Sequence, residues 1–441
     1  MAEPNFYAAT ASPAQVNALR SYFSHPGWGG RFEWRGLVGA GAYGAVVRVR
    51  EYFREPNRPS RDFVIKQAKT FQQEEDIRRE MKRLERVAGG LHIVQPIVVE
   101  HQNPFFDFDY LEAPRLHPTR RQQVRQEYER LGYLLGPTLV MKPIENGTLY
   151  EFYRKAIDHE VPVLPNRLLW RFFLCLVRSC IAMAYPQPFQ TPQNLENMPP
   201  YDGQVPSEFT HTDLHTGNVM LGNFDGFLPE HQITPILKLI DFGTWAQAER
   251  YNLDYMDFMK HGVTENIFSI GRIMEEMITY ERHDDFGPAV MFRNGGYMTR
   301  ARKLMARIND FGPLNLDEDL AILVIQCLAV EEMDRPSLRD LFNQVFMGMQ
   351  KPATSYTNYT RGYYWETDDI VRQVIYMVLH EAPAGGSLQG FDIAHDRSLS
   401  GHSTGAPASA PFPEDGEAKH KKILAESGSD KPKDKKDTAK G

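Results

Sequence analysis

The chain has 441 residues, of which 42% are hydrophobic and 24% charged, with a formal net charge of -7 at pH 7. This composition is typical of a globular protein, and the acidic balance excludes the basic electrostatic footprint of a nucleic-acid binder. The length suits one two-lobed catalytic unit with extensions, or two ordinary domains.

All three cysteines lie in apolar stretches: Cys175, Cys180 and Cys327. No Cys-x-x-Cys and no paired histidine ligands accompany them, so we expect neither a disulfide framework nor a zinc site, in a reducing compartment. Residues 1–13 lack an apolar signal core. The most apolar run, 172–184, contains Arg178 and is too short to span a bilayer. The sequence thus predicts a cytoplasmic or nuclear protein with no membrane partner.

The first third of the chain has mainly strand-like patterns. An N-terminal extension, residues 1–30, shows no clear period. Five strands are expected at residues 32–35, 46–49, 63–66, 93–99 and 138–141. A charged helix at 72–87, ended by two glycines, lies between the third and fourth strands. An insertion at 101–136, with a charged helical second half, separates the last two.

Helical patterns dominate the remainder. Apolar helices are expected at residues 164–185, 266–279 and 320–328, with short strands between 211 and 242. A last amphipathic helix begins after Thr367 as its N-cap, and its apolar face carries Ile370, Val374, Met377 and Val378. From residue 384 onward, small, polar and charged residues cannot bury enough apolar surface to offset chain entropy, so we expect a disordered tail.

A glycine-rich run, GAGAYGAV at residues 39–46, joins the first two expected strands. The candidate nucleotide-binding residues in this run are Gly39, Gly41, Gly44 and Val46. Glycines at this spacing let backbone amides approach phosphates closely, because glycine has no Cβ. A dinucleotide-binding turn would require a helix directly afterwards, whereas a valine-rich strand follows here. A flexible hairpin tip is the alternative interpretation of this run.

A lysine ends the third expected strand. The ammonium of Lys66 there can neutralise the α- and β-phosphates of a nucleotide, while a snorkelling surface lysine is the alternative. Glu80 in the next helix can pair with Lys66, and Leu84 follows it at helical spacing. The competing carboxylates are Glu74, Glu75 and Glu85.

Two polar motifs follow apolar segments in the second half of the chain. In HTDLHTGN, residues 211–218, Asp213 can accept or orient a hydroxyl proton, and Asn218 can bind a metal ion through its amide oxygen. In LIDFG, residues 239–243, Asp241 follows a buried strand and can ligate Mg²⁺ that bridges phosphates. The order and spacing of the two motifs indicate a site for metal-bound phosphate more strongly than either motif does alone.

Taken in order, these motifs resemble the eukaryotic protein kinase family over residues 32–346 or so. The resemblance implies an α+β, two-lobed protein-kinase-like fold with a small β-rich N-lobe and a mainly helical C-lobe. The implied boundaries are 1–30 for the extension, 31–144 for the N-lobe with its insertion at 101–136, 145–350 for the C-lobe, 351–383 for a helical extension and 384–441 for the disordered tail.

The resemblance also implies ATP and Mg²⁺ as cofactors. Lys66, paired with Glu80, would hold the α- and β-phosphates under the glycine-rich loop. Asp213 would be the catalytic base, and Asn218 and Asp241 would bind Mg²⁺.

It further implies an adenine site. Val46 would cover the adenine, Met220 would support it from below, and Met141 would be the gatekeeper. The backbone from Lys142 to Ile144 would hydrogen-bond the adenine edge.

Three departures from the family pattern affect the nucleotide and the regulation. Thr212 replaces an arginine that binds an activation-loop phosphate, so we expect that switch to be missing. His215 replaces a lysine and carries less charge at pH 7. Val64 replaces a small alanine and crowds the adenine.

Further departures lie in the expected C-lobe. No APE motif occurs between residues 243 and 266, so Arg335 lacks its usual partner and Glu265 is the candidate replacement. Asn266 replaces an aspartate that anchors the catalytic loop, which weakens the anchor by about 1 kcal/mol.

The leading hypothesis is a protein kinase that transfers the γ-phosphate of ATP to a Ser/Thr hydroxyl of a protein substrate. A pseudokinase or ATP-binding interaction module is one alternative, favoured by the altered Thr212, Val64, His215 and Asn266. The other is a kinase-like enzyme for a small molecule, because HTDLHTGN is also similar to the HGDLH-type loop of aminoglycoside- and choline-type phosphotransferases.

Overall fold

The computed structural model describes residues 13–24, 26, 29–40, 44–53, 57–68, 74–97, 137–187, 195–200, 204–207, 209–243, 262–282, 288–292, 295–311 and 316–381. All of them belong to Met1–Gly390, one of two units into which the chain divides. The expected insertion at 101–136, the tail from 384 and Gly41 lie outside these residues.

A four-stranded antiparallel sheet forms the first part of the structure, in the order β1-β2-β3-β4. Its strands are β1 (Phe32–Ala40), β2 (Gly44–Glu51), β3 (Arg61–Ala68) and β4 (Thr138–Met141). The fourth expected strand, at 93–99, was wrong over its described residues, 93–97. Ile93 and Pro96 there form only isolated bridges, to Leu239 and Met141.

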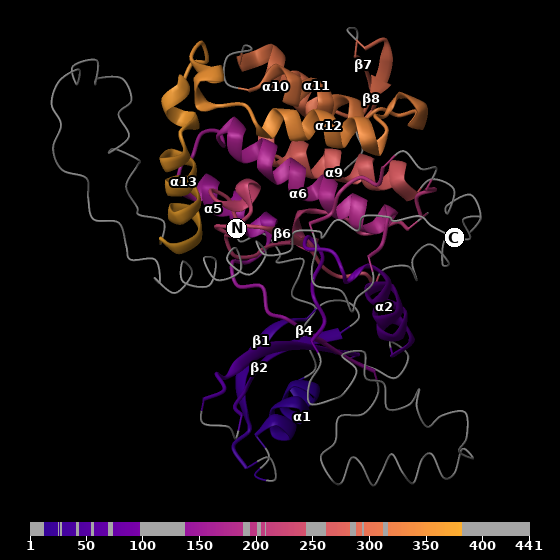
Figure 1. Cartoon of the computed structure of the whole chain (residues 1–441), viewed down its shortest axis with the longest axis vertical. Helices are drawn as coiled ribbons and strands as arrows, with labels where there is room; N and C mark the ends of the chain where they lie inside the picture. Colours follow the sequence, from indigo (N-terminus) through magenta and orange to yellow (C-terminus); the bar gives the residue numbers. More distant parts are fainter. Residues whose placement is uncertain are drawn as a thin grey trace, which may run out of the picture. The chain divides into compact units, whose positions relative to one another are not determined.

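The two faces of this sheet differ in their surroundings, because successive side chains of a strand point to opposite faces. On one face Val47, Val49 and Phe63 are buried, and helix α1 (Pro13–Phe23) covers them with Leu19 and Phe23. Figure 1 shows α1 beside β1 and β2. The period-free extension therefore contains a helix that the sequence pattern did not reveal.

The opposite face carries alternate residues of the same strands. Val46 lies directly across from Lys66, and Val64 across from Met141, so these four side chains share one face. Val46, Val64 and Met141 are only partly buried, although they are apolar. This half-covered apolar face is where the sequence places the adenine.

Helices form most of the remaining structure. They are α2 (Glu74–Val87), α5 (Leu149–Asp158), α6 (Asn166–Ala184), α9 (Gly262–Thr279), α10 (Arg302–Phe311), α11 (Glu318–Cys327), α12 (Leu338–Met349) and α13 (Asp368–His380). Every α6 residue except Arg167 is buried, with α9 and α12 packed alongside (Figure 1). A Cβ on Gly348 of α12 would lie 2.5 Å from the Trp170 ring, so glycine permits this close approach.

Helix α13 begins after Thr367, as the sequence predicts, and buries Ile370, Val374 and Val378. Thr367 does not cap it through its side chain, since its hydroxyl donates to the Tyr364 carbonyl instead.

Two short hairpins complete the described structure: β5 (Val219–Leu221) with β6 (Leu237–Leu239), and β7 (Val290–Phe292) with β8 (Tyr297–Thr299). The fold is therefore α+β, with small antiparallel sheets and a larger helical part. None of the described helices is both long and apolar enough to cross a membrane.

Candidate functional site

Lys66, Glu80 and Asp241 meet in one ion cluster, which we call the Lys66 cluster. The Lys66 Nζ lies 2.7 Å from Glu80 Oε2 and 2.8 Å from Asp241 Oδ1. Strand β3 supplies the lysine, helix α2 the glutamate, and the segment after β6 the aspartate. The competing Glu74 and Glu75 instead face Arg78 within their own helix.

The electrostatics of the Lys66 cluster follow from one cation between two carboxylates. Burial works against the Lys66 charge, but Asp241 and Glu80 outweigh it and raise the pKa of Lys66. Burial, with the nearby Asp241 charge, raises the pKa of Glu80 to about 7 against the attraction of Lys66. Burial also works against the Asp241 charge, yet Lys66 brings the pKa of Asp241 below its usual value. Fully ionised, the cluster carries one excess negative charge, which favours a further cation beside it.

Asp241 is the member of the cluster that reaches solvent, with 30% of its side chain exposed against 8% for Lys66. Its backbone φ is 59°, in the left-handed region that non-glycine residues rarely adopt. Such a conformation costs about 1–3 kcal/mol and persists where the surroundings impose it. A Cβ on Gly243 would lie 3.1 Å from both Asp241 Oδ1 and Glu80 Oε2, so a larger residue there would have to displace these carboxylates slightly.

Asp213 and Asn218 face each other across the loop that ends in a short 3-10 helix, η3 (Thr216–Asn218). Asn218 Nδ2 donates to the Asp213 carbonyl at 2.8 Å and to Asp213 Oδ2 at 3.2 Å. Because the amide nitrogen is engaged, Oδ1 of Asn218 is the side-chain atom available to a metal ion. The Asp213 carboxylate remains 44% exposed.

His215 lies beside this carboxylate. Its Nδ1 accepts from the Gly217 N–H at 3.0 Å, which leaves the proton on Nε2, 3.6 Å from Asp213 Oδ1. Burial works against the Asp213 charge, but His215 and neighbouring groups lower the pKa of Asp213 below its ordinary value. Asp213 is therefore an ionised acceptor at neutral pH.

The β5–β6 hairpin connects the Asp213 loop to Asp241. Val219 pairs with Leu239, and the Ile240 N–H donates to the Asn218 carbonyl at 3.0 Å. Asn218 precedes β5 and Asp241 follows β6, so both lie at the same end of the hairpin.

The loop before this hairpin is anchored by Asn266 of helix α9. Asn266 Oδ1 accepts from the His211 N–H at 3.0 Å, while its Nδ2 donates to the Phe209 carbonyl at 2.8 Å. The asparagine thus makes two buried bonds. Both hydrogen bonds of Asn266 have ordinary lengths, and the expected loss of about 1 kcal/mol relative to an aspartate stays a prediction.

The predicted adenine residues come from the four-stranded sheet, from the segment after β4 and from β5. An isolated bridge joins Met220 of β5 to Thr148. Lys142 N–H already donates to the Gln95 carbonyl at 2.8 Å, and Pro143 has no N–H. In this stretch Ile144 supplies the remaining backbone donor. Gly39 lies in β1 and Gly44 begins β2, while Gly41 lies outside the described residues.

Arg335 has the partner that its sequence context suggested. Its Nη1 lies 2.9 Å from Glu265 Oε1, and it also donates to the carbonyls of Thr264 and Ala329.

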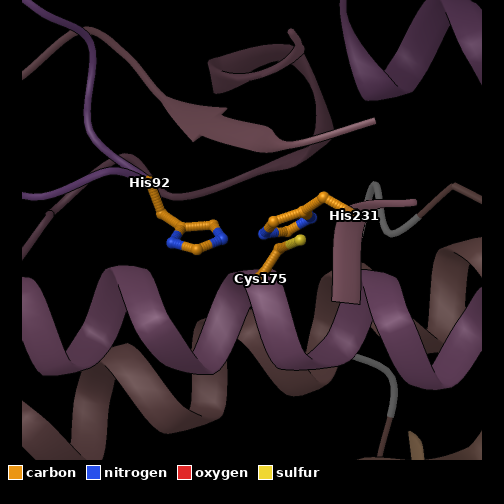
Figure 2. A group of neighbouring side chains, drawn as sticks. All are labelled: His92, Cys175 and His231. Carbon is orange, nitrogen blue, oxygen red and sulfur yellow. The ribbon is translucent and has the colours of Figure 1, made fainter. Parts of the chain in front are cut away.

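Sequence reasoning missed a second group of side chains, His92, Cys175 and His231, which we call the His92 cluster (Figure 2). Along the sequence no pair of histidines lies near a cysteine, but the fold brings His92 and His231 next to Cys175. The three residues belong to separate segments, so no local spacing could have indicated the group.

A scan of this sequence against protein-family models found no match, and a search of the curated proteins likewise returned none.

Proposed function

We propose that this protein is an ATP- and Mg²⁺-dependent phosphotransferase with a two-lobed, kinase-like fold. The observation that carries the proposal is Lys66 in contact with both Glu80 and Asp241, drawn from three separate segments. The sheet with α2 would be the smaller lobe, and the part from α5 onward the larger one. We also propose, from the order of the motifs, that the protein is related to the eukaryotic protein kinases.

The nucleotide would bind with its adenine on the apolar sheet face. Val46 and Met220 would enclose the ring, Met141 would limit its depth, and the Ile144 N–H would donate to its edge. Lys66, held in place by Glu80, would neutralise the α- and β-phosphates. Backbone amides of the glycine-rich turn would cover the phosphates.

Mg²⁺ would be held by Asp241 and by Oδ1 of Asn218. Carboxylate and amide oxygens are ligands that Mg²⁺ accepts, alongside phosphate oxygens and water. The excess negative charge of the Lys66 cluster and the exposure of Asp241 both favour a cation here. When bound, the ion neutralises charge on the transferred phosphoryl group.

In the transfer itself, the acceptor hydroxyl oxygen forms a bond to the γ-phosphorus as the bond to the ADP oxygen breaks. Asp213 accepts the hydroxyl proton, which its ionised state and exposure allow. Nε2–H of His215 points toward the same carboxylate and orients it. We propose a protein Ser/Thr hydroxyl as the acceptor.

The experiment is a turnover assay on the purified full chain with labelled ATP, with and without Mg²⁺. Serine and threonine peptides form one acceptor arm, and choline and aminoglycosides the other. We expect Mg²⁺-dependent transfer to peptides. Asp213→Ala should lower turnover by roughly 10²–10⁴-fold with nucleotide binding nearly intact, whereas the exposed Asp158→Ala should change neither.

Each other result rejects a stated part of the proposal. Transfer only to small alcohols would reject the protein acceptor. ATP binding without any turnover would make the protein a binding module. Full turnover by Asp213→Ala would remove Asp213 as the base.

A further inference from the structure

The His92 cluster gathers three donors of the kind that bind transition metals. His92 lies between α2 and β4, Cys175 in the middle of α6, and His231 at the end of a short 3-10 helix, η4 (Pro229–His231). Their potential ligand atoms all lie within 4.8 Å of one another, and none of the three residues is more than 1% exposed. Figure 2 shows both rings directed toward the cysteine above α6.

Three of the four ring nitrogens of the His92 cluster lack hydrogen-bond partners. Among the described residues, His92 Nε2 and both ring nitrogens of His231 have none. Leaving a buried polar group unpaired costs about 1–3 kcal/mol. A bound ion at this place would satisfy two of the three, one from each ring.

Glu196 orients one of the rings. Its carboxylate accepts from the His92 backbone N–H at 2.8 Å and contacts His92 Nδ1 at 2.6 Å. With Nδ1–H of His92 donating to the Glu196 carboxylate, the lone pair of Nε2 is left facing the cluster. A carboxylate behind a histidine ring is the arrangement that fixes metal-ligating histidines and strengthens them as donors.

We propose that His92 Nε2, Cys175 Sγ and one ring nitrogen of His231 bind a single transition-metal ion. Imidazole and thiolate together select Zn²⁺ or Cu⁺ rather than Mg²⁺ or Ca²⁺. Zn²⁺ is the first candidate. It lies about 2.0–2.1 Å from nitrogen and about 2.3 Å from sulfur, so the donors would close to roughly 3.5 Å apart. That contraction requires only small side-chain movements.

The charge at the site balances for Zn²⁺. Binding displaces the thiol proton of Cys175 to solvent and forms a zinc–thiolate bond, with no change in oxidation state. The thiolate and the Glu196 carboxylate together offset the two charges of the ion. The neighbouring ion pair, Arg178 with Glu230 at 2.6 Å, is already neutral by itself.

The position suits a structural ion. The Leu239 N–H donates to the His92 carbonyl at 2.8 Å, and η4 lies in the connection between β5 and β6. A metal ion would therefore fasten both the His92 segment and the far end of the β5–β6 hairpin to α6. The opposite end of that hairpin carries Asn218 and Asp241, although the metal site does not depend on the proposed phosphotransfer.

The test is the metal content of the full chain, expressed and purified without metal-affinity resin, by mass spectrometry. We expect one Zn²⁺ or Cu⁺ per chain, with the element identifying the ion. Cys175→Ser should lose most of the metal. Cys180→Ser is the matched control, because Cys180 is equally buried in the same helix, and it should retain the metal.

A second measurement needs only the wild-type protein, in case Cys175→Ser does not fold. After the native metal is removed by a chelator, added Co²⁺ should produce a thiolate-to-cobalt charge-transfer band. Subsequent addition of Zn²⁺ should remove this band by displacing the cobalt. Wild-type protein without bound metal and without this band would overturn the site. Metal retained by folded Cys175→Ser would overturn the assignment of its ligands.

Discussion

The Lys66 cluster and the His92 cluster each combine three side chains from separate segments, but they differ in whether the polar atoms of those side chains have partners. In the Lys66 cluster the ammonium contacts both carboxylates within 2.8 Å. In the His92 cluster the ring nitrogens that face the cysteine have no partner among the described residues. Internal ion pairs therefore maintain the first cluster without a ligand, whereas the second is complete only with a bound ion.

Exposure separates the two clusters as well. Asp241 and the nearby Asp213 reach solvent, so a nucleotide and its metal ion can approach them. The His92 cluster is enclosed, which suits an ion that enters during folding and stays. If both proposals hold, hydrogen-bond partners and solvent exposure together distinguish a substrate site from the site of a structural ion.

Removal of Lys66 should have the largest effect on stability. Lys66→Met leaves Glu80 and Asp241 without their cation, and breaking a buried ion pair in this way costs about 3–5 kcal/mol. Urea unfolding of the nucleotide-free protein measures the loss. The control is Lys82→Met, because Lys82 lies exposed on α2, the helix that carries Glu80, and its loss should change stability by less than about 0.5 kcal/mol. Equal stabilities of the two variants would show that the cluster does not stabilise the fold.

The pH dependence of the unfolding free energy should show how the Lys66 cluster holds its charges. Glu80 has a pKa of about 7 in the folded protein and an ordinary value of 4.5. The folded state therefore holds a proton that the unfolded state has lost, and this contribution to stability disappears as pH rises from 4.5 through 7, by at most about 1.4 kcal/mol per pH unit. Glu80→Gln cannot titrate and should show a flatter curve of unfolding free energy against pH. Parallel curves for the two proteins would contradict the raised pKa.

The smallest effect is expected in the metal-free His92 cluster. His231→Leu removes two unpaired polar atoms and replaces them with an apolar side chain, so unfolding of the chelated protein should change by less than about 1 kcal/mol. Added Zn²⁺ should raise the thermal midpoint of the wild type but not that of the variant. A large loss of stability in the absence of metal would mean that the ring has partners and that the two clusters are alike.

The sequence predicted what local patterns determine. The pairing of Lys66 with Glu80 was predicted from an apolar strand and from the helical position of Leu84, and both elements form, although β3 continues beyond Lys66 to Ala68. The apolar run of α6 likewise identified a buried helix. In each case the strand or helix itself was predicted from residues that lie within a few positions of one another.

Other features depended on contacts between distant segments. Helix α1 gains its stability from packing Leu19 and Phe23 against the sheet rather than from a clear period of its own. The segment around Ile93 contacts Leu239 and does not continue as a strand. The His92 cluster and its Glu196 partner combine four such segments, so no motif marks them.

One missed element did have a local signal. Helix α5 begins with a capping box, in which Thr148 accepts from the Glu151 N–H and the Glu151 carboxylate accepts from the Thr148 N–H. Thr-x-x-Glu before an apolar run is a recognised sign of a helix start.

The central claim is that the Lys66 cluster receives a nucleotide through a metal ion at Asp241. Calorimetric titration of ATP into wild type and Asp241→Asn, each with Mg²⁺ and with EDTA, tests this most directly. The account predicts that Mg²⁺ strengthens ATP binding to the wild type and that the variant loses this gain. ATP binding that is absent, or equally strong in all four titrations, would contradict it.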